Sequence, residues 1–280
     1  MKSVEKAYAK VNLTLAVGEK RPDGYHEVVS VMQRVSLHDT LTAEQTREGI
    51  TLTCSDPALP SGEENRAHRA ASLFFRETGI AGGAALTLEK RIPSQAGLGG
   101  GSSDAASVLL ALRKLYAPAL SDTELETMAA ALGSDVPFFI HGGTQLATGR
   151  GEVLSPLPPL TEGWFVIVKP AESFSTPAMY RRLDELPPQS PQSDGMTAAL
   201  GAGELRAVAA ALCNSFERVV PPDSAVWVIR EALRAQGALA AMLSGSGSAV
   251  FGLFDTETAA RAAVEALRPA WPEIFLARPV

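Results

Sequence analysis

The residues best suited to chemistry lie between Pro93 and Ser103, where four glycines and three serines are crowded together. The segment reads Pro93, Ser94, Gln95, Ala96, Gly97, Leu98, Gly99, Gly100, Gly101, Ser102 and Ser103. Its flanks are apolar, so we interpret it as a loop that leads into a helix at about residues 105–116, not as a linker. Glycine lets the backbone approach a ligand, consecutive N–H groups converge on oxygens, and the following helix adds its positive end. The composition therefore favours a phosphate cradle, with an empty tight turn as the alternative.

The spacing within this loop excludes three familiar nucleotide-binding patterns. No Gly-Lys-Ser/Thr closes it, as a Walker loop requires, and no register satisfies G-x-G-x-x-G. Dinucleotide-binding loops and protein-kinase loops are therefore excluded as well. A phosphate bound here must be held by a different arrangement.

The composition is that of an ordinary folded protein with an acidic balance. Hydrophobic residues make up 46% and charged residues 20% of the 280 residues, and the formal net charge is −6. No block of Lys or Arg interrupts that balance, so the field of the whole molecule would repel a polyanion and we expect no nucleic-acid partner. A small phosphorylated substrate is still compatible, because a few N–H groups and one or two cations can focus a local positive field.

The cysteine and histidine patterns argue against a metal centre built by protein side chains. Cys54 and Cys213 are the only cysteines and lie far apart, so neither a disulfide framework nor a cysteine-based zinc motif can be drawn. The other candidate ligands, His38, His68 and His141, have no zinc-ligand spacing. The N-terminal residues match a signal peptide poorly, and no apolar stretch is long enough to span a bilayer. We therefore expect a cytoplasmic protein without a membrane partner.

Helical and strand patterns alternate along the chain, which predicts an α+β protein. Strands are expected at residues 11–17, 28–35, 85–88 and 164–168, on both sides of 244–248, and at 274–277. Helices are expected at residues 65–77, 105–116, from a capping box at Ser121 to about Gly133, and at 204–212, 225–235 and 256–267. Residues 21–24 should form a turn, residues 187–191 a surface loop, and Asp135 a loop position just before Pro137. The prolines at 156–159 suggest a boundary between domains 1–155 and 156–280, the second a smaller α+β layer.

Three motifs resemble those of the GHMP kinases, the superfamily that includes galactokinase, homoserine kinase and mevalonate kinase. They are Ala7-Tyr8-Ala9-Lys10-Val11-Asn12-Leu13, the glycine-rich loop from Pro93 to Ser103, and Leu243-Ser244-Gly245-Ser246-Gly247-Ser248. Their order matches that of the superfamily and they extend over most of the chain. The resemblance implies a two-domain GHMP kinase fold, with an N-terminal ATP-binding α/β domain, a smaller C-terminal α+β domain and the active site between them. It also implies that ATP binds at the glycine-rich loop.

Two further strings are similar to one branch of this superfamily, which phosphorylates the 2-hydroxyl of a cytidyl diphosphate sugar alcohol in the non-mevalonate isoprenoid pathway. They are Arg21-Pro22-Asp23-Gly24-Tyr25-His26-Glu27 and Gly133-Ser134-Asp135-Val136-Pro137-Phe138-Phe139. The resemblance implies that Asp135 is the catalytic base and Lys10 its cationic partner. Without it, Lys10 is an ordinary strand-edge or snorkelling residue and Asp135 an ordinary cap or turn residue. Whether Asp135 removes the proton or orients the hydroxyl stays open.

The same resemblance implies roles for the remaining site residues. Tyr25 and Tyr180 would lie on the two faces of a cytosine ring and His26 at its edge, although His26 taken alone is a surface or turn histidine. Further contacts would come from Asn12 at the sugar alcohol, Asn65 near the adenine, and Gly245, Ser246 and Gly247 of the third motif. We expect Mg²⁺ to arrive with ATP, held partly by the phosphates and by Ser102 or Ser103.

Two other functions remain open at this stage. A GHMP kinase of the homoserine or mevalonate type would share the phosphate machinery but would leave the Tyr25–His26 string without an explanation. A non-catalytic ligand sensor would be favoured if Lys10 or Asp135 were absent, and both are present.

Overall fold

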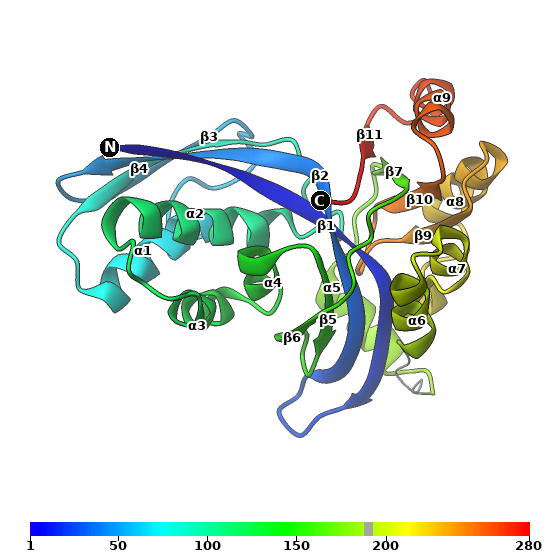
Figure 1. The fold of residues 1–280 in the computed structure, drawn as a ribbon. Coiled ribbons are helices and arrows are strands. Elements are labelled where there is room, and N and C mark those ends of the chain that lie inside the picture. Colours follow the sequence, from blue (N-terminus) through cyan, green and yellow to red (C-terminus); the bar gives the residue numbers. More distant parts are fainter. Residues whose placement is uncertain (188–192) are drawn as a thin grey trace. The chain divides into compact units, whose positions relative to one another are not determined.

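The computed structural model describes residues 1–187 and 193–280, and the chain divides into two compact units. Unit 1 contains residues 1–9, 38–94 and 99–142, and unit 2 contains residues 10–37, 95–98 and 143–280. The long strands β1 (Lys2–Lys20) and β2 (His26–Thr46) contribute residues to both units. Helices and sheets occur in each unit, which confirms the predicted α+β class (Figure 1). Each unit is built from several segments, whereas the proline-based division at residue 155 is a single cut and stays a prediction.

Unit 1 is a sheet with helices on one side (Figure 1). Strand β3 (Ile50–Cys54) runs parallel to β4 (Gly83–Glu89), and β4 pairs antiparallel with the second half of β2, with Thr40 opposite Glu89. The helices that pack against one another are α1 (Arg66–Thr78), α2 (Gly100–Tyr116), α3 (Asp122–Leu132) and α4 (Val136–His141).

Local signals fix several helix ends in unit 1. Asn65 caps α1 by accepting a hydrogen bond from the backbone N of Ala67 at 2.9 Å, and Gly79 ends the helix in the left-handed conformation with φ of 65°. Ser121 and Glu124 form the predicted capping box of α3. These helix boundaries were therefore predictable from short stretches of sequence, and the predictions are confirmed.

One prediction in unit 1 is wrong and another is confirmed. Helix α2 begins at Gly100 and not near Ala105, because packing overrides the poor helix propensity of glycine and serine. A Cβ on Gly100 would lie 3.1 Å from Cγ2 of Ile92, so the missing side chain lets the first turn approach its neighbour. Asp135 lies in a turn just before Pro137, as predicted, and is the N-cap residue of α4, a helix too short to show periodicity.

Unit 2 contains an antiparallel sheet in the order β11-β7-β10-β9. Its strands are β7 (Trp164–Val168), β9 (Ala240–Leu243), β10 (Val250–Phe254) and β11 (Ile274–Ala277), with α8 (Ala225–Ala235) and α9 (Glu257–Leu267) packed on it. Strand β5 (Thr144–Thr148) pairs with β2 and with β6 (Val153–Pro156), and β8 (Cys213–Asn214) pairs with β1. The remaining elements are α5 (Thr176–Leu183), α6 (Asp194–Ala202), α7 (Leu205–Ala210) and the 3₁₀ helix η1 (Ser215–Val219).

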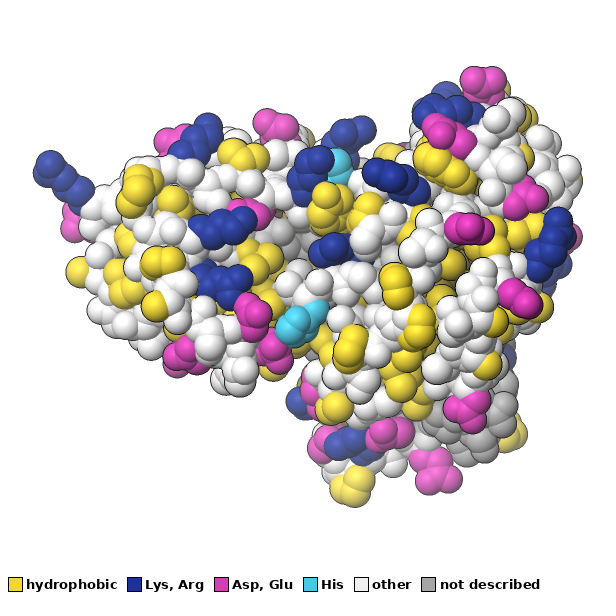
Figure 2. Space-filling model, viewed as in Figure 1, with side chains coloured by type: hydrophobic (Ala, Val, Ile, Leu, Met, Phe, Trp, Pro, Cys, Tyr) yellow, Lys and Arg dark blue, Asp and Glu magenta, His cyan; other side chains and the backbone are white. Residues whose placement is uncertain are grey.

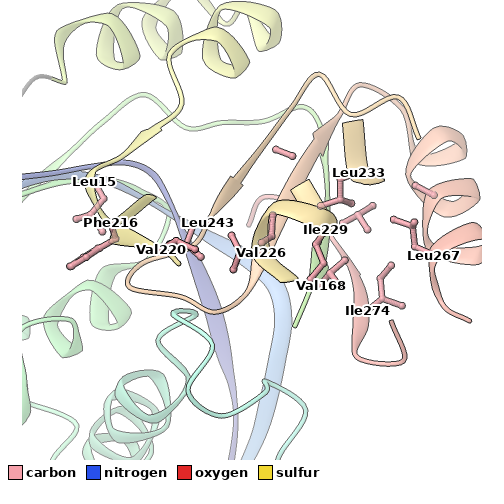
Figure 3. Close-up of a cluster of buried hydrophobic side chains, with 14 of the residues drawn as sticks. Leu15, Val168, Phe216, Val220, Val226, Ile229, Leu233, Leu243, Leu267 and Ile274 are labelled. Atoms are coloured by element: carbon pink, nitrogen blue, oxygen red, sulfur yellow. The ribbon is translucent and has the colours of Figure 1, made fainter. Parts of the chain in front are cut away.

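The core of unit 2 lies between this sheet and its helices (Figure 3). Ile229 and Leu233 of α8, Val168 of β7, Leu267 of α9 and Ile274 of β11 all belong to one cluster of buried hydrophobic side chains (Figure 3). Each such side chain, removed from water, contributes about 1.5–3 kcal/mol of hydrophobic stabilisation. The loop between β9 and β10, which carries the third motif, therefore starts and ends on well-packed strands.

Most predicted elements of unit 2 are confirmed. The strands at 164–168 and 274–277 and the helix at 225–235 have the predicted bounds, and Thr256 is the N-cap of α9. The helix expected at 204–212 is the shorter α7. The predicted surface loop begins at Pro187, but residues 188–191 lie outside the described residues. Elements that were not predicted are α5, α6, η1, β5, β6 and β8, together with β3 and α4 of unit 1.

Candidate active site

The glycine-rich loop lies against the loop between β9 and β10. Gly97 has a φ of 74°, and a Cβ built on it would lie 2.0 Å from the backbone O of Ser244, so only glycine fits there. Two hydrogen bonds join the loops: Ser244 Oγ donates to Gly97 O at 3.0 Å, and Ala249 N donates to Ala96 O at 3.2 Å. The second and third motifs, distant in the sequence, are therefore neighbours in unit 2.

The first motif joins the same loop through β1. The backbone N of Lys10 donates to Leu98 O at 2.9 Å. The Lys10 side chain is buried, and its Nζ donates to Asn12 Oδ1 at 2.6 Å. Asn12 in turn donates through Nδ2 to Ser30 Oγ at 2.8 Å, which fixes the orientation of its amide. Residues of all three predicted motifs thus meet, with a buried ammonium group held in a defined position.

The start of α2 supplies the features expected of an anion site. Gly99 precedes the helix with a φ of 74° and has no side chain to cap it, and the first N–H groups of a helix lack partners within it. Ser102 and Ser103 lie buried in the first turn. Arg66 of α1 brings its guanidinium to this turn, where Nη1 donates to Ser102 Oγ at 2.8 Å. Arg66 is a candidate phosphate ligand that the sequence reasoning missed, because its neighbour Ser102 is 36 positions away.

A buried charged cluster supports this first turn. Lys90 Nζ donates to Asp104 of α2 at 2.7 Å and also to Asp39, whose other oxygen accepts from the backbone N of Ile92 at 2.8 Å. Burial alone would lower the pKa of Lys90, but the two carboxylates raise it. Burial, opposed by Lys90 and assisted by the charge of Asp39, raises the pKa of Asp104 to about 7. The cluster links β2 and α2 to the segment that follows β4, and it was not predicted.

The predicted base-binding residues gather at the other end of β2 in unit 2. Tyr25 is 54% exposed, with the guanidinium of Arg150 4.9 Å from its ring centroid. The His26 ring stacks on Tyr180 with centroids 5.0 Å apart and 19° between the planes. His26 Nε2 lies 2.6 Å from Asp184 Oδ1. The structure therefore brings His26 and Tyr180 into direct contact, while Tyr25 stays exposed with Arg150 over one face of its ring.

The third motif is held in place by a residue that the sequence reasoning missed. Asn214 Nδ2 donates to Leu243 O at 2.9 Å and to Gly245 O at 2.8 Å, while its Oδ1 accepts from Phe216 N. Ser246 Oγ forms a 2.7 Å hydrogen bond with Thr176 Oγ1. A Cβ on Gly247 would lie 2.7 Å from the Phe174 ring, so the loop passes too close for any side chain. The only sequence signal for Asn214 is that Asn suits the residue before a short helix.

Asn65, predicted near the adenine, already uses both ends of its side chain. Its Oδ1 caps α1, and its Nδ2 donates to Pro60 O at 2.8 Å. A contact between Asn65 and adenine stays a prediction. The catalytic role of Asp135 also stays a prediction. Its side chain makes no capping hydrogen bond to α4.

The described residues can also be searched for a metal site and for a membrane-spanning helix. Within residues 1–187 and 193–280, no group of three or more His, Cys, Asp or Glu side chains is arranged to hold a metal ion, and no helix is long and apolar enough to cross a membrane. On the face drawn in Figure 2, acidic and basic side chains are interspersed and do not form a block of one sign.

Comparison with known proteins defines the family. The family model described as "GHMP kinases N terminal domain" matches residues 65–143, and that described as "GHMP kinases C terminal" matches residues 196–273. A homoserine kinase from Cytophaga hutchinsonii has the same fold, with a TM-score of 0.74 at 19% identity over 98% of this chain and 95% of that one. The chain is therefore a GHMP kinase, and the predicted fold is confirmed.

Closer relatives narrow the family. A 4-diphosphocytidyl-2-C-methyl-D-erythritol kinase from Symbiobacterium thermophilum is 45% identical over 274 residues, 97% of each chain. The crystal structure of a 4-(cytidine 5'-diphospho)-2C-methyl-D-erythritol kinase matches with a TM-score of 0.83 and 40% identity over 98% of each chain. The chain belongs to the 4-diphosphocytidyl-2-C-methyl-D-erythritol kinases, a family of small-molecule phosphotransferases, as its motifs predicted.

Proposed function

We propose that this chain transfers the γ-phosphoryl group of ATP to the 2-hydroxyl of 4-diphosphocytidyl-2-C-methyl-D-erythritol, a step of non-mevalonate isoprenoid biosynthesis. The observation that carries this proposal is 45% identity to a kinase of that name over 97% of both chains. The hydrogen bonds that join Lys10, the glycine-rich loop and the third motif support it, because they hold the residues of all three kinase motifs in one arrangement.

Lys10 and Asp135 are the proposed catalytic residues. Phosphoryl transfer to an alcohol needs the hydroxyl in line with the γ-phosphorus, the phosphate charge neutralised, and an acceptor for the proton. Asp135 acts as that acceptor or orients the hydroxyl. Lys10 supplies the positive charge, and its burial and its bond to Asn12 mean that little reorganisation is needed during the reaction.

The glycine-rich loop and the first turn of α2 are the proposed ATP-phosphate site. The backbone from Pro93 to Gly101 can approach the phosphates, and the positive end of the 17-residue α2 favours their charge. Mg²⁺ prefers hard oxygen ligands, and the buried hydroxyls of Ser102 and Ser103 fit that chemistry. The ion would be held mainly by phosphate oxygens, with one of these hydroxyls as a further ligand, and would neutralise phosphate charge.

The alcohol substrate is proposed to bind through unit 2. The exposed Tyr25 is proposed to stack on the cytosine ring through the face that Arg150 does not cover, and His26 and Tyr180 are proposed to take part in the recognition of the base. Asn12 is proposed to contact the sugar alcohol, and the backbone of residues 245–247 to complete the site. A cytoplasmic location stays a prediction.

A GHMP kinase acting on homoserine or mevalonate is the alternative function. The likeness to a homoserine kinase at 19% identity supports a shared fold and nothing beyond it. That alternative gives no role to the exposed Tyr25 or to the His26–Tyr180 stack.

A panel of alcohols incubated with ATP and Mg²⁺, scored by ADP release, tests the proposal. We expect ADP release with the cytidyl diphosphate sugar alcohol and background rates with homoserine and mevalonate. The reverse pattern would establish the alternative. Addition of excess CMP adds a second criterion, because it should compete with the alcohol but not with ATP.

A further inference from the structure

His26 makes two contacts with the last turn of α5, one through the face of its ring and one through Nε2. Tyr180 lies within α5, and its ring stacks on the imidazole with 19° between the planes. Asp184 follows the last residue of that helix, donates from its backbone N to Tyr180 O at 3.0 Å, and places Oδ1 2.6 Å from His26 Nε2. Residues four apart on a helix lie on the same face, so the plane of the imidazole and the nitrogen that meets the carboxylate are fixed together.

The carboxylate determines where the imidazole carries its proton. Burial opposes ionisation of Asp184, but hydrogen bonds from His26 and Lys20 outweigh it and hold the pKa of Asp184 below its usual value. An ionised carboxylate only accepts hydrogen bonds, so Nε2 must be the donor. In the neutral ring this leaves a lone pair on Nδ1, which makes no hydrogen bond among the described residues.

This inference rests on the proposed function, because it concerns how the base is read. We propose that Asp184 is a positioning residue: by holding His26 in the Nε2–H form, it makes Nδ1 an acceptor for the amino group of cytosine and so sets the preference for cytidyl over uridyl ligands. Cytosine presents an amino donor where uracil presents a carbonyl acceptor. An acceptor nitrogen on His26 can accept a hydrogen bond from the amino group of cytosine. Opposite the carbonyl of uracil, the same nitrogen has no hydrogen to accept, because both groups are acceptors. An unpaired polar group of this kind discriminates strongly between two ligands when the site excludes water. The His26 side chain is only 9% exposed, whereas its partner Asp184 is 31% exposed, so the imidazole itself has little contact with water.

The second contact of Asp184 offers an internal control. Lys20 Nζ lies 3.3 Å from the other carboxylate oxygen, and the Lys20 side chain is 56% exposed. An ion pair exposed to that degree contributes little, since water and salt screen it. The orientation of His26 therefore depends on Asp184 itself and not on Lys20.

Binding of CMP and UMP, measured by calorimetric titration of the full-length enzyme, tests the proposal without relying on turnover. We expect Asp184→Ala to reduce the ratio of the UMP Kd to the CMP Kd by about tenfold, the lower end of what losing the outer partner of a histidine costs at metal sites. Glu185→Ala removes the neighbouring exposed carboxylate, and Lys20→Met removes the other partner of Asp184. Both variants should keep the wild-type ratio.

A double-mutant cycle separates positioning from a general structural effect. If Asp184 acts through His26, then Asp184→Ala causes no further loss of preference in a His26→Ala background. Equal weakening of CMP and UMP binding by Asp184→Ala, or an additional loss of preference in the double variant, overturns the proposal. If wild-type enzyme binds CMP and UMP equally, the inference fails while the kinase activity can still stand. If it binds neither, the proposed base site fails and the inference with it.

Nitrogen NMR of the wild-type enzyme with labelled histidine gives a test that does not depend on the folding of any variant. The His26 resonances, assigned by their loss in His26→Ala, should show a proton on Nε2 and an unprotonated Nδ1 in the neutral form of the ring. A proton on Nδ1 contradicts the proposed role of Asp184.

Discussion

Replacing Gly97 with alanine should disrupt the contact that joins the second and third motifs. The new Cβ would lie 2.0 Å from Ser244 O, and real Cβ atoms essentially never approach closer than 3.0 Å, so the two loops must move apart. The left-handed conformation costs alanine about 1–2 kcal/mol. The movement also weakens the bonds from Ser244 Oγ to Gly97 O and from Ala249 N to Ala96 O, each worth about 0.5–1.5 kcal/mol. We therefore expect Gly97→Ala to lower the free energy of unfolding by about 2–5 kcal/mol.

Urea unfolding can be followed specifically in the unit that contains this contact. The three tryptophans of the sequence, Trp164, Trp227 and Trp271, all lie in unit 2 and border its core. Their fluorescence should show a lower unfolding midpoint for Gly97→Ala, while far-UV circular dichroism follows the whole chain. Gly101→Ala is the matched control, because its Cβ would meet only Arg66 Cδ at 3.5 Å within a helix, where alanine is favoured over glycine by up to about 1 kcal/mol. An unchanged midpoint for Gly97→Ala, or equal losses in both variants, would refute the close approach of the loops.

The remaining predictions concern the nucleotide, the base, the proton and the buried cluster. Gly100→Val should abolish ATP binding, since its Cβ would lie 3.1 Å from Cγ2 of Ile92 and a branched side chain there would displace the first turn of α2; an unchanged ATP Kd in a titration would locate the phosphates elsewhere. Tyr25→Ala should remove the stacking contact with the cytosine ring, which is worth about 1–3 kcal/mol per base. The KM for the cytidyl substrate should therefore rise by the corresponding factor, while the KM for ATP stays unchanged. Asp135→Asn should lower kcat by roughly 10² to 10⁴ with ATP affinity retained, and near wild-type turnover would remove Asp135 from the mechanism. Because the pKa of Asp104 is raised to about 7, the folded chain holds a proton that the unfolded chain releases near pH 4; stability should therefore fall as pH rises through this window, and Asp104→Asn should flatten the fall in urea midpoint between about pH 5 and pH 8.

The elements that could be predicted from the sequence are those defined by nearby residues. Asn65 and Gly79 bound α1, and the capping box at Ser121 starts α3. The strand at 274–277 and the helix at 225–235 have the predicted bounds because the pattern of apolar residues that defines each element lies entirely inside it. In each case the information lies within a few residues of the element.

The parts that could not be predicted depend on partners far along the chain. Helix α2 begins among glycines and serines because its first turn packs on Ile92 and Arg66, which composition does not reveal. Lys90 forms a buried cluster with Asp39, which is 51 positions away, and no sequence motif predicts this cluster. Asp184 is 158 positions from His26, so the sequence suggested the histidine but not the carboxylate that orients it. The composition of the glycine-rich loop predicts a ligand site, whereas the residues that support the loop could be found only from the fold.

The decisive test of the proposed activity is the position of the new phosphate on the product. Enzyme incubated with ATP, Mg²⁺ and 4-diphosphocytidyl-2-C-methyl-D-erythritol should release one ADP for each alcohol consumed. Phosphorus and carbon NMR of the purified product should show a phosphomonoester coupled to the carbon that bears the 2-hydroxyl, with the cytidyl diphosphate intact. A phosphate on another hydroxyl, or ADP formed without a phosphorylated alcohol, would contradict the proposed reaction.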